Sequence, residues 1–198
     1  MKQLEKICVF CGSKSGKDPI YTQAAFKLGT ILGQKKIQLI YGAGGTGVMH
    51  AVAEGCKQAG GSLQGVTIDR LFSMEQPDLS EGEVKIFHHM FTRKVSMTKD
   101  ADAFVVLPGG LGTMDELFEL MTLKQLGIVK APLVVLNINF FFDGLRSFVH
   151  QFIRDGFVEY YGDNGNPAEA VGVIRYGDTF KHAGGAMRFD MGFGGTRK

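Results

Sequence analysis

Short apolar runs alternate with longer amphipathic stretches along most of the chain. A continuous apolar run predicts a strand buried on both faces of a sheet, and apolar positions three or four residues apart predict a helix. This alternation predicts an α/β, Rossmann-like fold, in which a mostly parallel sheet carries helices on both faces. The predicted strands are residues 7–11, 37–41, 63–68, 84–90, 103–107 and 133–138. The predicted helices are residues 20–34, 48–59, 92–99, 113–126 and 143–155.

The chain of 198 residues fits one domain, and no repeat or linker divides it. We expect a single α/β domain over residues 1–198, with its core in residues 6–158. Residues 69–83 are polar and are expected to be irregular. The tail, residues 160–198, is rich in Gly, Asn and Asp, and its last stretch has little apolar periodicity. We expect this tail to be loosely ordered or to wrap a neighbouring subunit.

Composition and charge exclude several classes of protein. Hydrophobic residues make up 44% of the chain and the net charge is +2, so bulk binding to nucleic acid or to a membrane surface is not expected. No apolar run approaches the ~18 residues of a membrane span. The N-terminus leads directly into a predicted strand and does not resemble a signal peptide. We therefore expect a cytoplasmic protein.

The cysteines and histidines do not suggest a redox or metal site. Cys8 and Cys11 form a C-x-x-C pair, but they lie on a predicted strand and face opposite sides, so we expect buried thiols. Cys56 completes no disulfide framework. His88 and His89 are adjacent on a predicted strand and cannot both face one ion. No other spacing resembles a zinc site, and we predict no catalytic metal.

Three turns rich in glycine or small residues follow predicted strands, at residues 12–16, 42–47 and 109–112. Ligands of parallel sheets bind beyond the carboxyl ends of the strands, so these turns mark the expected binding edge. The third turn opens a helix, whose N–H groups and dipole suit an anion such as a phosphate, and Glu116 would lie beside that anion. Thr113 and Glu116 also have the spacing of a capping box, which would explain these two residues but not the glycines.

Two further patterns are open to more than one interpretation. Arg93 and Lys94 fall in the first turn of a predicted helix, where the helix dipole disfavours cations. Such a conflict indicates either a functional site or a solvated basic pair on a helix that begins elsewhere. The turn at residues 42–47 reads G-x-G-x-x-G, and Asp69 follows near the end of the next predicted strand. That is the fingerprint of a dinucleotide site, which would favour an oxidoreductase.

The segment Pro108-Gly109-Gly110-x-Gly112-Thr113-x-x-Glu116 resembles the signature of the Lonely Guy family. Those proteins were long mislabelled lysine decarboxylases and look like phosphoribohydrolases of nucleoside 5′-monophosphates. The resemblance covers roughly residues 6–158. It includes a Met-x-x-Arg-Lys segment beginning at Met90, a related glycine turn at residues 42–47, and a Cys-Gly-Ser turn that ends at Ser13. The chain departs from the family at Lys14, where Ser is usual, and at His50, where a small residue is usual.

The resemblance implies hydrolysis of an adenine-type or cytokinin-type nucleoside 5′-monophosphate to the free base and ribose 5-phosphate, without a cofactor. It gives catalytic roles to Glu116 and Arg93, and it implies a homodimer or a larger even assembly. Residues 42–47 would then belong to the nucleotide pocket. Thr122 is open to a second interpretation as a back-bonded helix residue. The implied substrate-binding residues are Ser13, Gly44, Gly45, Glu75, Met90, Lys94, Gly109, Gly110, Leu111, Gly112, Thr113, Met114, Asp115 and Thr122.

Two other classes of protein use similar turns. A non-catalytic nucleotide-binding or sensing module would need the same glycine turns without a catalytic carboxylate. An NAD-dependent oxidoreductase would use the fingerprint at residues 42–47. The sequence leaves open whether the substrate is AMP or a prenylated nucleotide.

Overall fold

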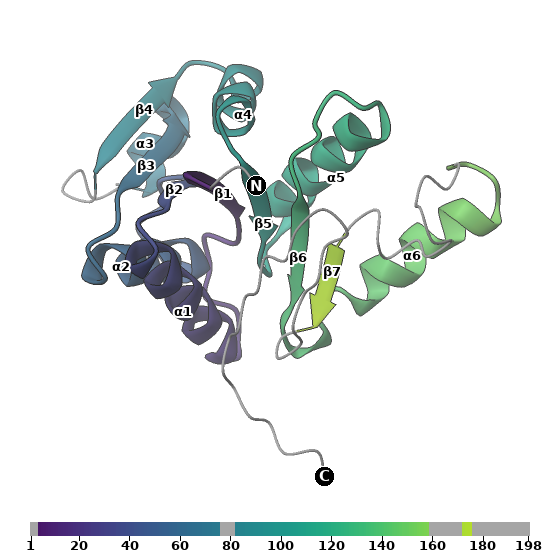
Figure 1. The fold of residues 1–198 in the computed structure, drawn as a ribbon, viewed down its shortest axis with the longest axis horizontal. Coiled ribbons are helices and arrows are strands. Elements are labelled where there is room, and N and C mark those ends of the chain that lie inside the picture. Colours follow the sequence, from purple (N-terminus) through teal and green to yellow (C-terminus); the bar gives the residue numbers. More distant parts are fainter. Residues whose placement is uncertain (1–3, 76–81, 159–171, 176–198) are drawn as a thin grey trace, which may run out of the picture.

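The structure, a computed structural model, describes residues 4–75, 82–158 and 172–175 (Figure 1). Its strands form one sheet in the order β4-β3-β2-β1-β5-β6-β7, and all neighbouring strands pair in parallel. The strands are β1 (Lys6–Phe10), β2 (Gln38–Tyr41), β3 (Leu63–Ile68), β4 (Glu83–Phe87), β5 (Ala103–Val106), β6 (Leu133–Asn137) and β7 (Gly172–Arg175). The helices are α1 (Ile20–Gln34), α2 (Gly47–Gln58), α3 (Asp69–Glu75), α4 (Met90–Lys99), α5 (Leu111–Gln125), the 3₁₀ helix η2 (Ile138–Phe140) and α6 (Asp143–Arg154).

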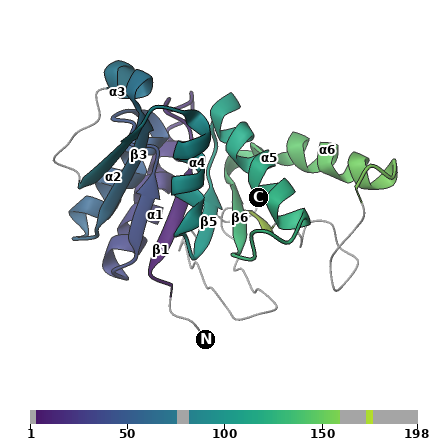
Figure 2. The ribbon, with the colours of Figure 1, turned by 90° about the horizontal axis from the view of Figure 1, so that it is seen from above.

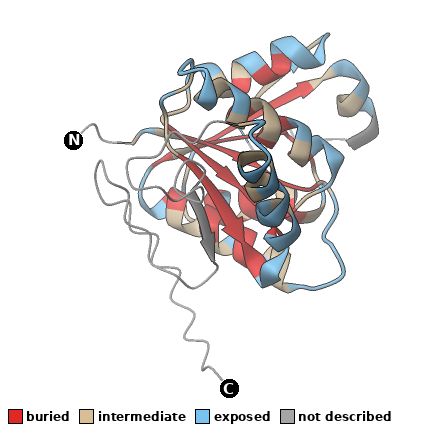
Figure 3. Cartoon of the chain, turned by 90° about the vertical axis from the view of Figure 1, so that its right-hand side faces the viewer, coloured by how far each residue is buried: buried red, intermediate tan, exposed pale blue. Residues whose placement is uncertain are grey.

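The helices cover both faces of the sheet, as the predicted fold class requires (Figures 1 and 2). On one face, α1 and α2 pack Leu28 and Val52 against Val9 of β1. On the other face, α4 and α5 pack Met97 and Leu117 against the strands. Figure 3 shows the buried strands between helices whose outer surfaces are exposed. The two cores follow from the alternation of side chains along each strand, which sends every second residue to the opposite face.

The strand order predicts a ligand-binding crevice beyond the carboxyl ends of the central strands β1 and β5. The chain runs outward from β1 through β2, β3 and β4, then returns to β5 on the other side of β1. Loops that follow β1 and β5 therefore diverge to opposite faces. Ligands of such sheets bind at this switch point, beyond the carboxyl ends of the two strands. The turns at residues 12–16 and 109–112 follow these two strands.

Several elements differ from the sequence prediction. Residues 69–75 form helix α3, although the segment 69–83 was expected to be irregular. Strand β7 lies within residues 160–198 and pairs with β6, so part of the predicted loose tail extends the sheet. An edge strand is held by backbone hydrogen bonds, which a periodicity of side chains does not reveal. The rest of that tail lies outside the described residues.

The predicted buried thiols are confirmed. Cys8, Cys11 and Cys56 are free and buried, and Cys8 and Cys11 belong to the cores on opposite faces of the sheet. Burial raises the pKa of Cys8 well above its usual value and that of Cys56 to about 11. These thiols are therefore protonated and unreactive at neutral pH. Within the described ranges, no helix combines the length and apolarity that spanning a membrane requires.

Candidate active site

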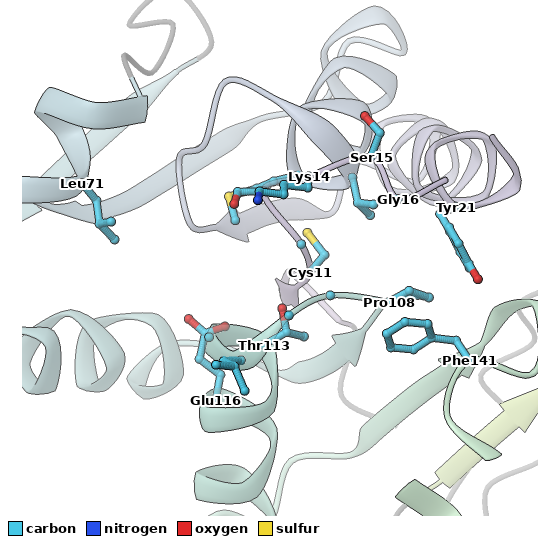
Figure 4. A pocket seen from close by; sticks show the side chains of 18 of the residues that line it. Cys11, Lys14, Ser15, Gly16, Tyr21, Leu71, Pro108, Thr113, Glu116 and Phe141 are labelled. Atoms are coloured by element: carbon cyan, nitrogen blue, oxygen red, sulfur yellow. The ribbon is translucent and has the colours of Figure 1, made fainter. Parts of the chain in front are cut away.

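A cavity of about 460 Å³ lies at the switch point, within the range of roughly 300–1,000 Å³ that small-molecule sites occupy. Its walls come from the turn at residues 11–16, the start of α2, and residues 108–113. Figure 4 shows Glu116 and Thr113 on one wall of this cavity, with Lys14 and Ser15 on the opposite wall. Other lining residues are Tyr21, Val48, Met49, Leu71, Arg93, Glu116 and Phe141.

Backbone contacts hold the three glycine turns together. The Gly12 N–H donates to the Pro108 carbonyl at 3.1 Å, and the Gly12 carbonyl accepts from the Met49 N–H at 3.0 Å. The Thr46 hydroxyl donates to the Ser13 carbonyl at 2.8 Å. A Cβ on residue 109 would lie 2.1 Å from Oγ1 of Thr113, so only glycine fits this approach. The cavity walls are thus fixed by main-chain packing.

Helix α5 presents its N-terminus to the cavity. It begins at Leu111 after an extended Gly110, whose carbonyl accepts the Met114 N–H at 3.1 Å, and no side chain among the described residues caps it. The first N–H groups of such a helix have no intrahelical partner, and the dipole is positive there. A Cβ at residue 110 or 112 would meet no atom within 4 Å, so this turn is open toward the cavity. The arrangement suits an anion.

The predicted capping box is wrong. Thr113 is the third residue of α5 and is buried, so it cannot be the residue before the helix. Glu116 does not fold back on the backbone but accepts a hydrogen bond from Nη1 of Arg93 at 3.2 Å. Glu116 pairs with Arg93 of α4 instead of the local backbone, because a charge-assisted hydrogen bond in a buried site is stronger than a hydrogen bond to a neutral N–H group.

Arg93 and Glu116 form a buried ion pair at the cavity. Their side chains are 6% and 9% exposed. Nε of Arg93 also donates to the Val66 carbonyl at 2.9 Å, so two contacts fix the plane of the guanidinium. Helix α4 begins at Met90, two residues before its predicted start, and Arg93 is its fourth residue. The interpretation of Arg93 as a solvated surface cation is therefore wrong.

Burial sets the protonation of Glu116. It raises the pKa of this carboxyl from 4.5 to about 7, against the opposing effect of the Arg93 charge. A carboxyl with a pKa near neutrality exchanges protons at physiological pH, as a general base or acid must. Because its pKa is displaced and it has a specific charged partner in a cavity, Glu116 is the candidate for the chemical centre of the site.

Lys94 belongs to a neighbouring network rather than to the cavity wall. Its Nζ contacts a carboxylate oxygen of Asp115 at 3.1 Å and one of Glu119 at 2.7 Å, and it lies 5.7 Å from the ring centre of Phe91. These contacts tie α4 to α5 on the flank of the Arg93 pair. Lys94 and Asp115 therefore lie beside the Arg93–Glu116 pair and do not line the cavity.

Several other predicted binding residues lie off the cavity wall. The Thr122 hydroxyl donates to the Phe118 carbonyl at 2.9 Å within α5, which is the back-bonded arrangement. The Gly44 N–H contacts the sulfur of Met49 at 3.0 Å. Glu75 ends α3, and its side chain lies outside the described residues. The described lining of the cavity also omits Gly45, Met90 and Met114.

The remaining predicted binding residues line the cavity: Ser13, Gly109, Gly110, Leu111, Gly112 and Thr113. Sequence reasoning missed Tyr21, Leu71 and Phe141. Phe141 follows the carboxyl end of β6, so the rule that located the other turns also applied there. Leu71 lies on α3, which was not predicted, and Tyr21 carries no signal that separates it from the core of α1. No cluster of three metal-ligating side chains occurs within the described part of the chain.

Fold and site together define a Rossmann-like α/β protein with a glycine-lined pocket at the switch point of its sheet. A molybdenum cofactor binding protein from Rippkaea orientalis shares this fold, with a TM-score of 0.59 and 19% identity over 76% of this chain and 87% of that chain. The protein TM1055 does so with a TM-score of 0.57 and 22% identity over 87% and 92% of the two chains.

Sequence comparison identifies the family. A family model described as possible lysine decarboxylase matches residues 49–162. The cytokinin riboside 5′-monophosphate phosphoribohydrolase LOG7 of Arabidopsis thaliana is 40% identical over 156 residues, 79% of this chain and 72% of the relative. The phosphoribohydrolase LOG1 of the same plant is 39% identical over 156 residues, 79% and 73% of the two chains. The chain belongs to the Lonely Guy family.

Proposed function

We propose that this protein is a phosphoribohydrolase, which cleaves the N-glycosidic bond of a purine nucleoside 5′-monophosphate to give the free base and ribose 5-phosphate. The observation that carries the proposal is the buried Glu116–Arg93 pair beside the uncapped N-terminus of α5, within one cavity. Relatives about 40% identical over most of the chain bear the name of this activity. An adenine-type base, including prenylated cytokinins, is the proposed substrate class.

The cavity separates binding from chemistry. The turn at residues 109–113 receives the 5′-phosphate at the N-terminus of α5, where backbone N–H groups favour an anion. This anchor holds the ribose against Glu116. Such fixed geometry lowers the activation free energy, because the entropy of bringing the reacting groups together is lost when the substrate binds. Arg93 keeps the carboxylate in one orientation through its contacts to Glu116 and Val66.

The reaction follows the chemistry of other glycoside hydrolyses. The bond between C1′ of the ribose and the base breaks with its electron pair leaving on the base, and positive charge develops on the sugar. The ionised Glu116 stabilises that charge and takes a proton from the attacking water, whose oxygen bonds to C1′. Returning this proton to the departing base restores the carboxylate and balances the reaction.

The structure offers less support for the oxidoreductase alternative. Gly42 and Gly47 serve packing: a Cβ on Gly42 would lie 2.7 Å from Nη2 of Arg93, and one on Gly47 would lie 2.4 Å from the Ser13 carbonyl oxygen. Gly44 and Gly45 do not line the cavity among the described residues. Asp69, the expected ribose ligand of a dinucleotide site, pairs with His88 instead. A titration with NADH, followed by fluorescence, tests this alternative directly.

The proposed activity is tested by following base release from AMP. Purified protein is incubated with AMP, ADP, ATP and adenosine at equal concentration, and with the N6-isopentenyl analogue of AMP. We expect adenine from AMP and little from adenosine, because charge-assisted hydrogen bonds to the phosphate contribute about 1.5–3 kcal/mol each. Nucleotide binding without base release would instead identify a sensing module. Equal rates with AMP and adenosine would mean that the turn at residues 109–113 does not recognise phosphate.

We also propose a homodimer or a larger even assembly, in a cytoplasmic setting. Phe91 and Val95 are 77% and 59% exposed on one side of α4, four residues apart. Exposed apolar side chains gathered on one helix face are typical of an interface. Light scattering at micromolar concentration tests the assembly, and a monomer there would contradict it.

A further inference from the structure

Lys14 places a cation on the cavity wall. It lines the cavity from the turn that follows β1, and its side chain is exposed. The other lining cation, Arg93, is neutralised by Glu116. Within the part of the chain that the structure describes, the Lys14 ammonium has no hydrogen bond or ion pair. With Glu116 ionised, the lining side chains therefore carry one uncompensated positive charge.

The backbone around Lys14 is anchored, although its side chain has no hydrogen bond or ion pair to any residue that the structure describes. The two preceding residues are held from both sides: the Gly12 N–H by the Pro108 carbonyl, and the Ser13 carbonyl by the Thr46 hydroxyl. A Cβ on Gly47 would lie 2.5 Å from the Lys14 carbonyl carbon, so the turn packs directly on the start of α2. Lys14 thus extends from a fixed base, and only its flexible stem needs to be ordered by a ligand.

The position of Lys14 complements that of the glycine turn. Figure 4 shows it across the cavity from Thr113 and Glu116. An anion at the N-terminus of α5 meets backbone N–H groups on one side and faces the wall that carries Lys14 on the other. A phosphate dianion needs more positive charge than a helix terminus, equivalent to roughly half an elementary charge, supplies. A long lysine side chain can provide that charge from the opposite wall.

We propose that Lys14 is a specificity-determining residue, whose ammonium binds the 5′-phosphate of the substrate opposite the turn at residues 109–113. This inference rests on the proposed function, because it assigns Lys14 to the phosphate of that substrate. Lys14 forms no hydrogen bond or ion pair with Glu116 or Arg93, so it acts on binding and leaves the chemical step to them. It makes the enzyme select a phosphorylated substrate over the free nucleoside.

The test compares Lys14→Met with Lys17→Met. Lys17 is an exposed lysine of the same segment that does not line the cavity, so its replacement removes the same charge without touching the site. We expect Lys14→Met to raise KM for AMP by a factor of about 10 to 100 with little change in kcat. Lys17→Met should leave both constants unchanged. Lys14→Arg should recover most of the affinity, and the slow rate with adenosine should not respond to any of the three.

A binding measurement separates this inference from the proposed activity. Calorimetry with ribose 5-phosphate needs no turnover. If the wild type releases no base from AMP but binds ribose 5-phosphate more tightly than Lys14→Met does, the proposed activity fails and the role of Lys14 stands. If Lys14→Met and Lys17→Met bind ribose 5-phosphate equally, or if the wild type does not bind it, the role of Lys14 is refuted. Thermal melting of each variant verifies that it is folded.

Discussion

Nη1 of Arg93 donates a hydrogen bond to Oε1 of Glu116 at 3.2 Å, between two side chains that are almost fully buried. Burying two charges is costly, and such a pair seldom adds stability over apolar residues of the same size. Its position at the wall of a cavity gives it another use, because the guanidinium fixes the carboxylate where a substrate can meet it. The Val66 carbonyl completes this arrangement by holding Nε of Arg93 at 2.9 Å.

Replacing Glu116 by Gln should remove most turnover and leave the fold intact. The amide oxygen can still accept from Arg93, but an amide neither takes a proton from water nor stabilises a cationic sugar. Loss of a general base typically lowers kcat by a factor of about 10² to 10⁴. Base release from AMP and thermal melting test this expectation together. A variant that melts early yet turns over normally while folded would make Glu116 a structural residue.

Replacing Arg93 by Ala should harm activity more than replacement by Lys. The alanine variant leaves Glu116 buried without a partner, which costs about 3–5 kcal/mol of folding stability in comparable buried pairs. Lys retains the charge but cannot contact both Val66 and Glu116 through a planar fork, so its kcat should remain below that of wild type. Steady-state kinetics after a check of folding by circular dichroism decides the order. Normal kinetics in the alanine variant would remove Arg93 from the mechanism.

Activity should depend on pH through Glu116. In the proposed mechanism the ionised carboxylate is the active form, so kcat at saturating AMP should rise with pH, with an apparent pKa of about 7. Arg93 lowers this pKa, so in Arg93→Lys the rise in kcat should move to higher pH if the lysine ammonium lies farther from the carboxylate. In Glu116→Gln the pH-dependent rise should be absent. A kcat that falls through this range would make Glu116 an acid in the rate-limiting step.

The raised pKa of Glu116 also makes the stability of the fold depend on pH. The folded carboxyl holds its proton more tightly than the unfolded one, since burial raises its pKa from 4.5 to about 7. The folded state therefore binds more protons between these values, and the contribution of Glu116 to the free energy of unfolding falls as pH rises through this window. Denaturant titrations of the wild type and of Glu116→Gln should differ in their pH dependence in this interval.

The sequence predicted most elements because their patterns are local. The bounds of α1 agree residue for residue with the predicted helix 20–34, since its apolar positions recur at helical spacing along its whole length. Two failures have long-range causes. β7 is defined by pairing with β6, and Glu116 pairs with Arg93 of α4 although Thr113 and Glu116 locally match a capping box. Neither contact can be read from neighbouring residues.

The candidate site was predictable to the same extent. Strand ends and glycines indicated the turns at residues 12–16 and 109–112, because ligands of a parallel sheet bind beyond the carboxyl ends of its strands. The pairing of Arg93 with Glu116 joins two helices and required the fold. Tyr21 of α1 and Phe141, which follows β6, both line the cavity. Their rings contact each other edge to face, with 5.9 Å between the ring centres. No sequence pattern links these two residues.

The packing of α1 on α2 should control the site from a distance. A Cβ on Gly29 would lie 2.0 Å from the Val52 carbonyl oxygen, so Gly29→Ala must push the two helices apart. Val52 lies about one turn beyond Met49, whose N–H holds the Gly12 carbonyl at the cavity. We expect a loss of about 1–3 kcal/mol in the free energy of unfolding, typical of overpacking, together with a higher KM for AMP.

Gly144→Ala is the matched control for this last variant. Gly144 is exposed near the start of α6, and an added Cβ would meet no atom within 4 Å. Alanine there should raise the stability by about 0.5–1 kcal/mol, because glycine in a helix loses more conformational freedom on folding. Denaturant unfolding and AMP kinetics on both variants test the expectation. If Gly29→Ala matches Gly144→Ala in stability and KM, the close approach of α1 and α2 does not position the turn at residues 12–16.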